Sequence, residues 1–352
     1  MSTKVVKNKK EKKERKKINP IFIILGVLAA AILIVVIVFI AMRESGKHRL
    51  YSKATSAEVT DGDFFDTEKD IEYNGHTYHY NKDIMTFLVL GIDTGNALPT
   101  VDENTNYHQG GQSDAIFLFV MNPHDKTISV VAVNRNTMTD IYICDEHNNY
   151  VKTAKAQICV QHGYGDGLEL SCERSRQAVS GLMYGLPING YVSIRLHAIA
   201  TLNDMLGGVE VTLPSDFPEL GLSAGTTVRL DGEQAYTFVK FRDVTVFNSA
   251  GTRLENEKVY LKAFMKQVYD ITKTNITFPV GMYQQILDYT VTDITVDEMM
   301  YLASELLGYS VLEPEIYMLP GETQKVNAFE EFHVDEQGLK ETILDIFYEI
   351  TD

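Results

Sequence analysis

Two aspartates lie at the ends of apolar runs that are typical of buried strands. Asp93 follows the run at residues 85–92, and Asp114 precedes the run at residues 115–121. A carboxylate at a strand end beside a glycine-rich loop suits an oxygen-liganded cation such as Mg²⁺, which takes one or two carboxylates together with phosphate oxygens and water. Either aspartate taken alone is more typical of a turn or a helix cap, so the hypothesis of a cation site depends on the two aspartates together.

Four basic residues stand out in an acidic part of the chain. Arg135 ends a third apolar run, and Arg253 is predicted to begin a long helix, close to the positive end of its dipole. Lys240 and Arg242 are two residues apart and share a face if that segment is extended. Arginine forks and helix N-termini bind phosphate oxygens, and a divalent cation neutralises phosphate charge. These residues therefore point to a pyrophosphate site, with surface ion pairs as the alternative.

Other catalytic systems leave no trace in the sequence. It contains no G-x-S-x-G elbow, no H-E-x-x-H zinc motif and no phosphate-binding P-loop. Of nine histidines, only His162 lies in a glycine-rich segment, where a structural role is more common than catalysis. Cys144, Cys159 and Cys172 show no metal-ligand spacing, and they can form one disulfide or serve as three apolar packing residues.

The elements that position these residues alternate between strands and helices. Continuous apolar runs predict buried strands, and apolar residues at helical spacing predict amphipathic helices. Strands are predicted at residues 85–92, 115–121, 127–133 and 209–213, with a hairpin turn at 122–125, and helices at residues 168–184, 196–206, 231–238 and 254–272. Residues 85–272 are therefore predicted to form an α/β sandwich, in which helices flank a central mixed sheet.

The segments on either side have a weaker pattern. Residues 43–84 are polar and predict a stalk, with a hairpin around Asn74-Gly75 because Asn-Gly favours a tight turn. Residues 273–352 predict a mostly helical C-terminal extension without a chemistry-bearing motif. Its helices are clearest at residues 296–307 and 337–350, and a strand is predicted at residues 316–319.

The net charge of −16 combines two ends of opposite character. Residues 1–17 hold nine basic and two acidic side chains, a net +7, so the other 335 residues carry −23. Residues 21–42 hold no charge, and as a helix they span roughly 33 Å, enough for a bilayer core of about 30 Å. We expect a cytoplasmic tail at residues 1–19 and a retained signal-anchor at residues 20–42. The positive-inside rule then places the rest of the chain outside the plasma membrane after a single pass.

Eight segments between residues 85 and 270 occur in a distinctive order and spacing. They are FLVLGIDT, GQSDAIFLFVMNP, ISVVAVNRNTM, GYGDG, GLPINGYVSI, LNDMLGGVEV, LDGEQAYTFVKFRD and GTRLENEK. Single segments are weak signals, but the ordered set resembles the LytR-CpsA-Psr family, whose domain is also called the cell envelope-related transcriptional attenuator domain. A basic tail followed by a single anchor is similar to that family as well.

The resemblance implies an α/β domain with a hydrophobic tunnel for a polyprenyl chain. It also implies a phosphotransferase that depends on Mg²⁺, with Mn²⁺ as the alternative. Such an enzyme moves a glycopolymer phosphate from a polyprenyl-pyrophosphate carrier in the membrane lipid to a peptidoglycan hydroxyl. By this resemblance, Asp93 and Asp114 are the metal-side carboxylates. The catalytic residues are these two together with Arg135 and Arg242. The substrate-binding residues are Arg135, Lys240, Arg242, Arg253 and Glu257. The general base stays open between an aspartate near the metal, Asp243 and Glu257.

Several positions depart from the family's pattern, so the chain is a divergent member. The family often has Arg, Arg and Asp where this chain has Gly95, Gln112 and Asn136, and Lys240 replaces the first Arg of its R-F-R pattern. Its R-x-x-R-Q-Q pattern reads Arg253-Leu254-Glu255-Asn256-Glu257-Lys258. Each donor lost near a pyrophosphate costs on the order of 10²–10³ in rate.

These departures leave two functions open outside the membrane. One is the phosphotransferase, and the alternative is a non-catalytic polyprenyl-phosphate or cell-wall binding protein on the same fold. The composition excludes a disordered chain or a disulfide-dense mini-protein, and the acidity argues against nucleic acid as a partner. A transcriptional regulator is disfavoured because a cytoplasmic part of about 20 residues has no room for a helix-turn-helix.

Overall fold

The computed structural model describes residues 20–54, 65–94, 98–243, 245–306, 308–309 and 314–351. In its first helix, side chains are described only at residue 33 and from residue 36 onward. The predicted cytoplasmic tail at residues 1–19 lies outside the described residues.

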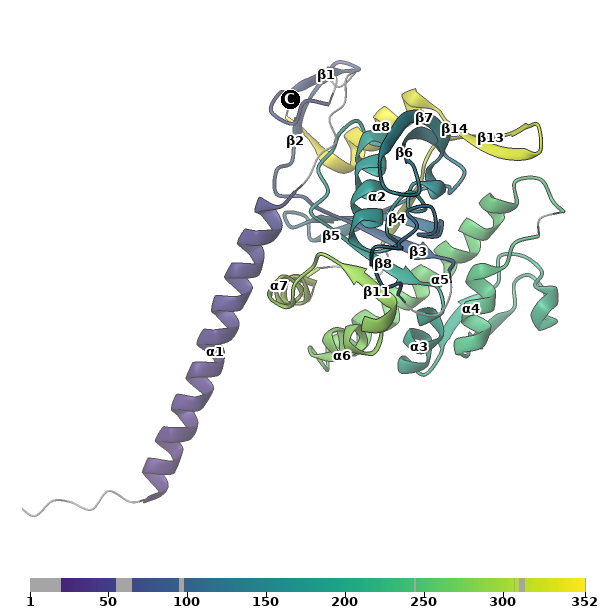
Figure 1. Cartoon of the computed structure of the whole chain (residues 1–352). Coiled ribbons are helices and arrows are strands. Elements are labelled where there is room, and N and C mark those ends of the chain that lie inside the picture. The colour runs from purple at the N-terminus through teal and green to yellow at the C-terminus, as the bar shows by residue number, and fades with distance from the viewer. Residues whose placement is uncertain are drawn as a thin grey trace, which may run out of the picture.

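A six-stranded mixed sheet forms the centre of the fold (Figure 1). Its strands, in spatial order, are β11 (Thr290–Thr292), β8 (Gly190–Arg195), β3 (Met85–Ile92), β4 (Ser113–Asn122), β5 (Thr127–Ala132) and β12 (Glu315–Met318). β3 is antiparallel to β4 and parallel to β8, and β12 is parallel to β5. The three apolar runs of the sequence are β3, β4 and β5, and the predicted central mixed sheet with helices is confirmed.

Helices cover both faces of the sheet, because each strand alternates its apolar side chains between two cores. On β3, Leu88 and Leu90 face the core that contains α2 (Glu169–Leu182) and α8 (Glu336–Phe347). Met85 and Phe87 face the opposite core, which contains α5 (Ser249–Thr272) and α7 (Val296–Leu306). α3 (Ala198–Met205), α4 (Gly232–Lys240) and α6 (Phe278–Gln285) join α5 in two smaller cores.

Smaller sheets complete the described structure. One sheet contains β1 (Ile71–Tyr73), β2 (His76–Tyr80) and β15 (Tyr348–Ile350). The others are antiparallel pairs of two strands. They are β6 (Met138–Cys144) with β7 (Tyr150–Gln157), β9 (Val209–Thr212) with β10 (Thr227–Leu230), and β13 (Gly321–Val326) with β14 (Phe329–Val334). Single turns of 3-10 helix lie at η1 (Ile158–Val160), η2 (Pro218–Leu220) and η3 (Leu287–Tyr289).

Turn and cap signals in the sequence lie where they were predicted. Asn74 and Gly75 have φ angles of 50° and 85°, and they join β1 to β2 in a tight hairpin. Asp231 accepts a hydrogen bond from the backbone of Gln234 at the start of α4, and the Gln234 side chain completes the capping box. Such signals are read correctly from sequence because their hydrogen bonds join residues only a few positions apart.

Two predicted boundaries near the basic residues are wrong. The long helix α5 begins at Ser249, so Arg253 lies in its second turn and not at its start. Lys240 is the last residue of α4, so Lys240 and Arg242 do not share the face of a strand. The first error arises because residues 249–253, at the start of α5, carry little apolar periodicity.

The prediction of a mostly helical C-terminal extension is also wrong. Residues 273–351 contribute three helices, but also β11 and β12, which form the two edges of the central sheet. They contribute β13, β14 and β15 as well. The boundary predicted at residue 272 therefore cuts through the sheet. The strand predicted at residues 316–319 is confirmed as β12, whereas β11 has only three residues held by backbone hydrogen bonds and leaves little pattern in the sequence.

The predicted stalk packs against the main body over its described residues. α1 (Pro20–Ser52) continues ten residues beyond the predicted anchor, and its Leu50 is fully buried in the core shared with α7. Nζ of Lys53 lies 2.8 Å from Oε2 of Glu298 on α7, whose side chain is only 1% exposed. β2 pairs with β15, so the segment after the helix joins the end of the chain (Figure 1).

The predicted signal-anchor at residues 20–42 falls in α1, most of whose early side chains lie outside the described residues. Over the described part of the chain, we find no helix with the length and apolar character needed to cross a membrane.

We expect a chain that ends at Thr272 to lose cooperative folding. It lacks β11 and β12, and it also lacks α8, whose Ile343 and Phe347 are fully buried in the core. Urea unfolding followed by circular dichroism should show no sharp transition, whereas a chain that ends at Phe347 keeps both edge strands and should keep the transition. A transition of the Thr272 chain at the urea concentration of the full chain would show that the C-terminal part is a separate extension.

Candidate functional site

Asp114 lies in a β-bulge at the start of β4. The β3–β4 register shifts between Gly91 and Ile92, and Asp114 is the extra residue. A bulge re-aims a side chain and is common beside active sites. Here it presents the Asp114 carboxylate to two arginines. Nη1 of Arg135 lies 2.8 Å from Oδ1, and Nη1 of Arg253 donates to Oδ2 at 2.9 Å.

Arg135 follows β5 and reaches back over the start of β4. Its Nη2 donates to Oε1 of Gln112 and to the sulfur of Cys159, which is 3.1 Å away. Burial acts to lower the pKa of Arg135, but the neighbouring Cys159 and Asp114 outweigh it, and the net pKa is raised. Nε of Arg135 is buried without a hydrogen-bond partner among the described residues. Arg135 therefore stays charged and keeps one unused donor.

Arg253 and Glu257 lie one helical turn apart on α5, which brings their side chains together. Nε of Arg253 lies 3.4 Å from Oε1 of Glu257, and both residues are buried. Burial raises the pKa of Glu257 to about 8, although the charge of Arg253 acts in the opposite direction. Near neutral pH this carboxyl is therefore mostly protonated and leaves the positive charge of Arg253 uncancelled.

Arg242 lies just beyond α4, in the segment that leads to α5. Its Nε donates to the hydroxyl of Ser249 at 2.8 Å, and its Nη2 lies 3.5 Å from Oε2 of Glu330 on β14. Burial lowers the pKa of Arg242, and the charges of Arg253 and Arg135 lower it further. These three guanidinium groups thus act on one another, and we call Arg135, Arg242 and Arg253 the arginine cluster.

Asp93 and Lys240 form a separate pair beside the cluster. The backbone N–H of Asp93 donates to the carbonyl of Gln112 at 3.4 Å, so the ends of β3 and β4 lie together. Nζ of Lys240 lies 3.0 Å from Oδ1 of Asp93 and 3.0 Å from the hydroxyl of Tyr236. These two hydrogen bonds raise the pKa of Lys240. Because both charged side chains are at least one-third exposed, this pair is a weaker constraint than the buried one around Asp114.

An apolar cavity of about 140 Å³ lies between the sheet and helices α3, α4 and α5. Side chains of β3, β4 and β8 form one wall, and Glu257 is the one charged residue of its lining. At Gly91 any side chain would collide with this packing, since a Cβ would lie 2.9 Å from the Cβ of Ala115. Glu257 also pairs with Arg253, so the apolar cavity borders the arginine cluster directly.

The donor set fits a divalent cation only in part. Asp93 and Asp114 are two oxygen donors at neighbouring strand ends, which suits Mg²⁺ that takes its other ligands from phosphate and water. However, both oxygens of Asp114 already contact arginines, and Asp93 contacts Lys240. Among the described residues there is no group of three or more metal-binding side chains. The described side chains therefore do not fit a cation site made of protein ligands alone. They fit a cation that is held mainly by the oxygens of a bound phosphate.

The two side chains considered as general bases have different surroundings. Asp243 is exposed, and hydrogen bonds from the Thr245 hydroxyl and backbone lower its pKa. It is therefore a weak base that caps a turn. Glu257, with a pKa of about 8, is basic enough, but it lies on the cavity side of Arg253.

The cysteines and the loop histidine have structural roles. Cys144, Cys159 and Cys172 are buried and free, so no disulfide joins them. Burial lowers the pKa of His162 to about 4, and its Nδ1 lies 3.3 Å from the carbonyl of Gly111. His162 is therefore a neutral packing residue near neutral pH.

Four residues contact the basic side chains of the site in a way that the sequence analysis did not predict. Gln112 and Cys159 hold Arg135, Tyr236 holds Lys240, and Glu330 holds Arg242. Tyr236 could have been found, because it precedes Lys240 by one helical turn. Glu330 carries no such signal, since it is almost ninety residues from Arg242.

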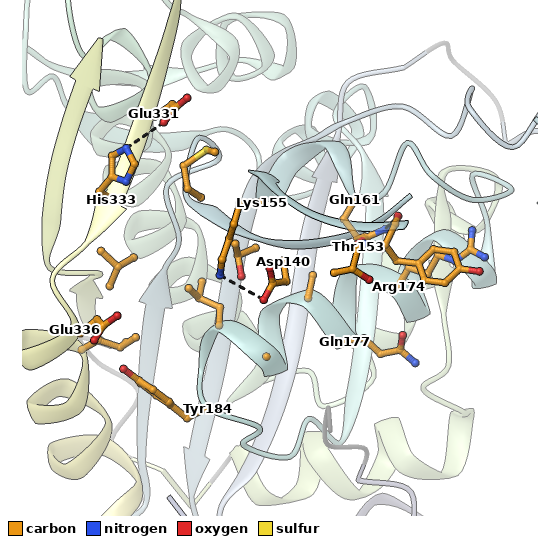
Figure 2. Close-up of a pocket in the computed structure, with 18 residues that line it drawn as sticks. Asp140, Thr153, Lys155, Gln161, Arg174, Gln177, Tyr184, Glu331, His333 and Glu336 are labelled. Carbon is orange, nitrogen blue, oxygen red and sulfur yellow. Dashed lines mark hydrogen bonds and ion pairs between the residues drawn. The ribbon is translucent and has the colours of Figure 1, made fainter. Parts of the chain in front are cut away.

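A much larger pocket, of about 1100 Å³, lies between the β6–β7 hairpin, α2 and β14 (Figure 2). Two pairs of its polar side chains contact each other, Lys155 with Asp140 at 3.3 Å and His333 with Glu331 at 3.1 Å. None of the predicted site residues lines it. Size alone therefore does not identify the site, and we assign the candidate site to the arginine cluster and the apolar cavity.

Comparisons with known proteins agree on one family. Residues 46–345 match the LytR_cpsA_psr family. The polyisoprenyl-teichoic acid--peptidoglycan teichoic acid transferase TagU of Enterococcus faecalis is 27% identical over 228 residues, which are 63% of this chain and 66% of that protein. This chain thus spans about two thirds of that relative's length.

Solved structures show the same fold. TagV of B. subtilis has a TM-score of 0.59 at 18% identity, over 75% of this chain and 97% of that one. Protein gbs0355 of Streptococcus agalactiae has a TM-score of 0.61 at 18% identity, over 75% and 86% of the two chains. Because the family match covers most of the sequence, including both strand-end aspartates and the arginine cluster, this chain belongs to the LytR-CpsA-Psr family.

Proposed function

We propose that this protein is a transferase of cell-wall glycopolymers, which moves a glycopolymer phosphate from a polyprenyl-pyrophosphate carrier to a peptidoglycan hydroxyl. The observation that carries the proposal is the contact between the arginine cluster and the apolar cavity through Glu257. A lipid-linked pyrophosphate needs positive charge for its phosphates and an apolar wall for its chain. The name of the E. faecalis relative, a polyisoprenyl-teichoic acid--peptidoglycan teichoic acid transferase, supports the same class.

The arginines are held in place for this role before any ligand arrives. Asp114 gives one oxygen to Arg135 and the other to Arg253, so both guanidinium groups are oriented by one carboxylate. Donors that are already oriented lose little free energy to reorganisation when charge develops on a phosphate. We propose that Arg135 and Arg242, whose side chains are 12% and 26% exposed, contact the pyrophosphate oxygens.

Transfer in this proposal is an in-line displacement at phosphorus. The acceptor hydroxyl oxygen forms the new P–O bond, the bond to the polyprenyl-phosphate oxygen breaks, and the hydroxyl proton passes to the released polyprenyl phosphate or to solvent. The arginine cluster stabilises the negative charge that develops on that leaving oxygen. A Mg²⁺ ion held by Asp93, Asp114 and phosphate oxygens would supply Lewis acidity at the same phosphate.

We also propose that residues 21–42 anchor the protein in the plasma membrane, with the N-terminus in the cytoplasm. The charge-free run and the basic residues before it support this orientation. An anchor would keep the arginine cluster close to a carrier that is itself confined to the membrane.

A non-catalytic lipid-binding protein is the second candidate function. The observation that favours it is the ion pairing inside the site, where Asp114 uses both oxygens on arginines and Lys240 contacts Asp93. Such a site can bind phosphate through its remaining donors and still lack a free carboxylate for the proton of the acceptor.

We expect Arg135→Lys to reduce transfer on the order of 10²–10³-fold, because one ammonium cannot replace a fork that contacts Asp114, Gln112 and Cys159. The measurement is the release of polyprenyl phosphate from a pyrophosphate-linked teichoic acid in the presence of peptidoglycan fragments. Arg229→Lys on β10, where the side chain is 52% exposed, is the control and should keep the full rate. An unchanged transfer rate in Arg135→Lys would show that the arginine cluster has no role in the mechanism. Tight binding of the donor without turnover in the wild type would favour the non-catalytic binding protein.

We expect Glu257→Gln to become more stable than the wild type as pH rises from about 5 to 8. The pKa of Glu257 is raised from 4.5 to about 8 in the folded protein, so the folded state binds the proton more tightly in this window. The stability that protonation contributes is complete below pH 4.5 and is lost as pH rises through 8, whereas glutamine does not titrate. The difference in unfolding free energy should reach about 4–5 kcal/mol at pH 9.

Urea unfolding at pH 5, 6.5, 8 and 9 measures this difference. Glu255→Gln on the same helix is the control, because the Glu255 side chain is 50% exposed and pairs with Lys258. Its pH dependence should follow that of the wild type. Parallel curves for Glu257→Gln and the wild type would contradict a protonated Glu257 in the folded state.

A further inference from the structure

A second, mostly polar pocket of about 450 Å³ opens on the other side of the arginine cluster. Its walls come from Arg135, Arg242, residues 245–249 and the β13–β14 hairpin, and we call it the hairpin pocket. It is distinct from the apolar cavity, with which it shares no lining residue.

A line of side-chain contacts connects the apolar cavity to the hairpin pocket. Glu257 lines the cavity, Arg135 lines the hairpin pocket, and Arg253 and Asp114 lie between them. The three N–O distances along this line are 3.4, 2.9 and 2.8 Å. A phosphate bound at the cluster would therefore have an apolar space on one side and the hairpin pocket on the other.

Hydrogen bonds join the walls of the hairpin pocket. The N–H of Asn248 donates to Oε1 of Glu330 at 2.8 Å, and the hydroxyl of Thr323 donates to Oδ1 of Asn248 at 2.8 Å. Nε2 of Gln157 donates to the carbonyl of Glu330 at 2.7 Å. The pocket is therefore formed in advance, as ligand sites usually are.

Two phenylalanines line the pocket and remain exposed to solvent. Phe247 is 56% exposed and Phe329 is 69% exposed, so neither ring is used by the core. Polar side chains of Gln157 and Lys325 stand in the same wall. The negative face of an aromatic ring attracts the C–H groups of a sugar, and neighbouring polar groups hydrogen-bond its hydroxyls.

Glu330 holds one of the cationic side chains of this pocket. Its Oε2 is buried, has no hydrogen-bond partner among the described residues, and lies 3.5 Å from Nη2 of Arg242. Because this oxygen is closed off from solvent, it orients Arg242 and does not reach a ligand. The ligand that matches two exposed rings beside hydrogen-bonding side chains is a saccharide.

We propose that the hairpin pocket is the binding site of the acceptor saccharide. Phe247 and Phe329 stack on its sugar rings, Gln157 and Lys325 bind its hydroxyl or carbonyl groups, and the reacting hydroxyl is directed toward the arginine cluster. This assignment rests on the proposed transferase function, and it makes the C-terminal hairpin a determinant of which acceptor is used.

The test is a double variant, Phe247→Ala with Phe329→Ala, in the full chain. The probe is a soluble peptidoglycan tetrasaccharide, whose direct binding is titrated without donor and whose KM is then measured in the transfer assay. We expect both the dissociation constant and KM to rise by about tenfold or more, with the affinity for polyprenyl phosphate unchanged. Tyr150→Ala on β7, which removes an exposed ring outside the pocket, is the control. The single variant Phe329→Tyr keeps an aromatic ring at this position, so it should bind the tetrasaccharide as the wild type does.

Three outcomes would overturn this assignment. One is equal tetrasaccharide affinity and KM in the wild type and the double variant. A second is loss of binding to vesicles of polyprenyl phosphate and anionic lipid with saccharide affinity intact, which would assign the two rings to a membrane contact. The third is a wild type that does not bind the tetrasaccharide at all. A wild type that binds the tetrasaccharide through these rings but releases no polyprenyl phosphate would contradict the transferase and leave the saccharide site standing.

Discussion

The buried carboxylate of Asp114 between two guanidinium groups is the interaction on which the site depends. Taking an ion out of water costs several kcal/mol unless its partners are well placed, so Asp114, Arg135 and Arg253 have to arrive together. The β-bulge supplies the carboxylate, the end of β5 supplies Arg135, and the second turn of α5 supplies Arg253. Folding of the sheet against α5 and assembly of the site are therefore one event.

The cluster keeps a positive charge inside a strongly acidic protein although burial acts against that charge, because nearby groups such as Asp114 stabilise it. In the interior, charges act on one another through a low dielectric and are little screened by salt, so nearby groups outweigh the distant surface field. The same burial raises the pKa of Glu257 and keeps it mostly neutral, so it contacts Arg253 without cancelling it. A site for an anion can thus persist in a chain whose net charge would repel that anion.

The C-terminal segment links the architecture to the chemistry. Its strands β11 and β12 close the two edges of the sheet that positions Asp93 and Asp114. Its hairpin β13–β14 carries Glu330, which contacts Arg242 and the segment before α5. A part of the chain without any catalytic motif therefore borders the candidate site.

The sequence by itself determined the three apolar strands, the turns, the caps and the identity of the charged residues, because these depend on local periodicity and short-range hydrogen bonds. Only the tertiary structure decided which charges meet. Asp114 with Arg253, and Arg242 with Glu330, are joined across long stretches of chain, and nothing in local spacing reports such a contact. The positions of β11 and β12 at the sheet edges and the raised pKa of Glu257 were likewise decided by the tertiary structure, because strand pairing and burial are properties of the folded chain alone.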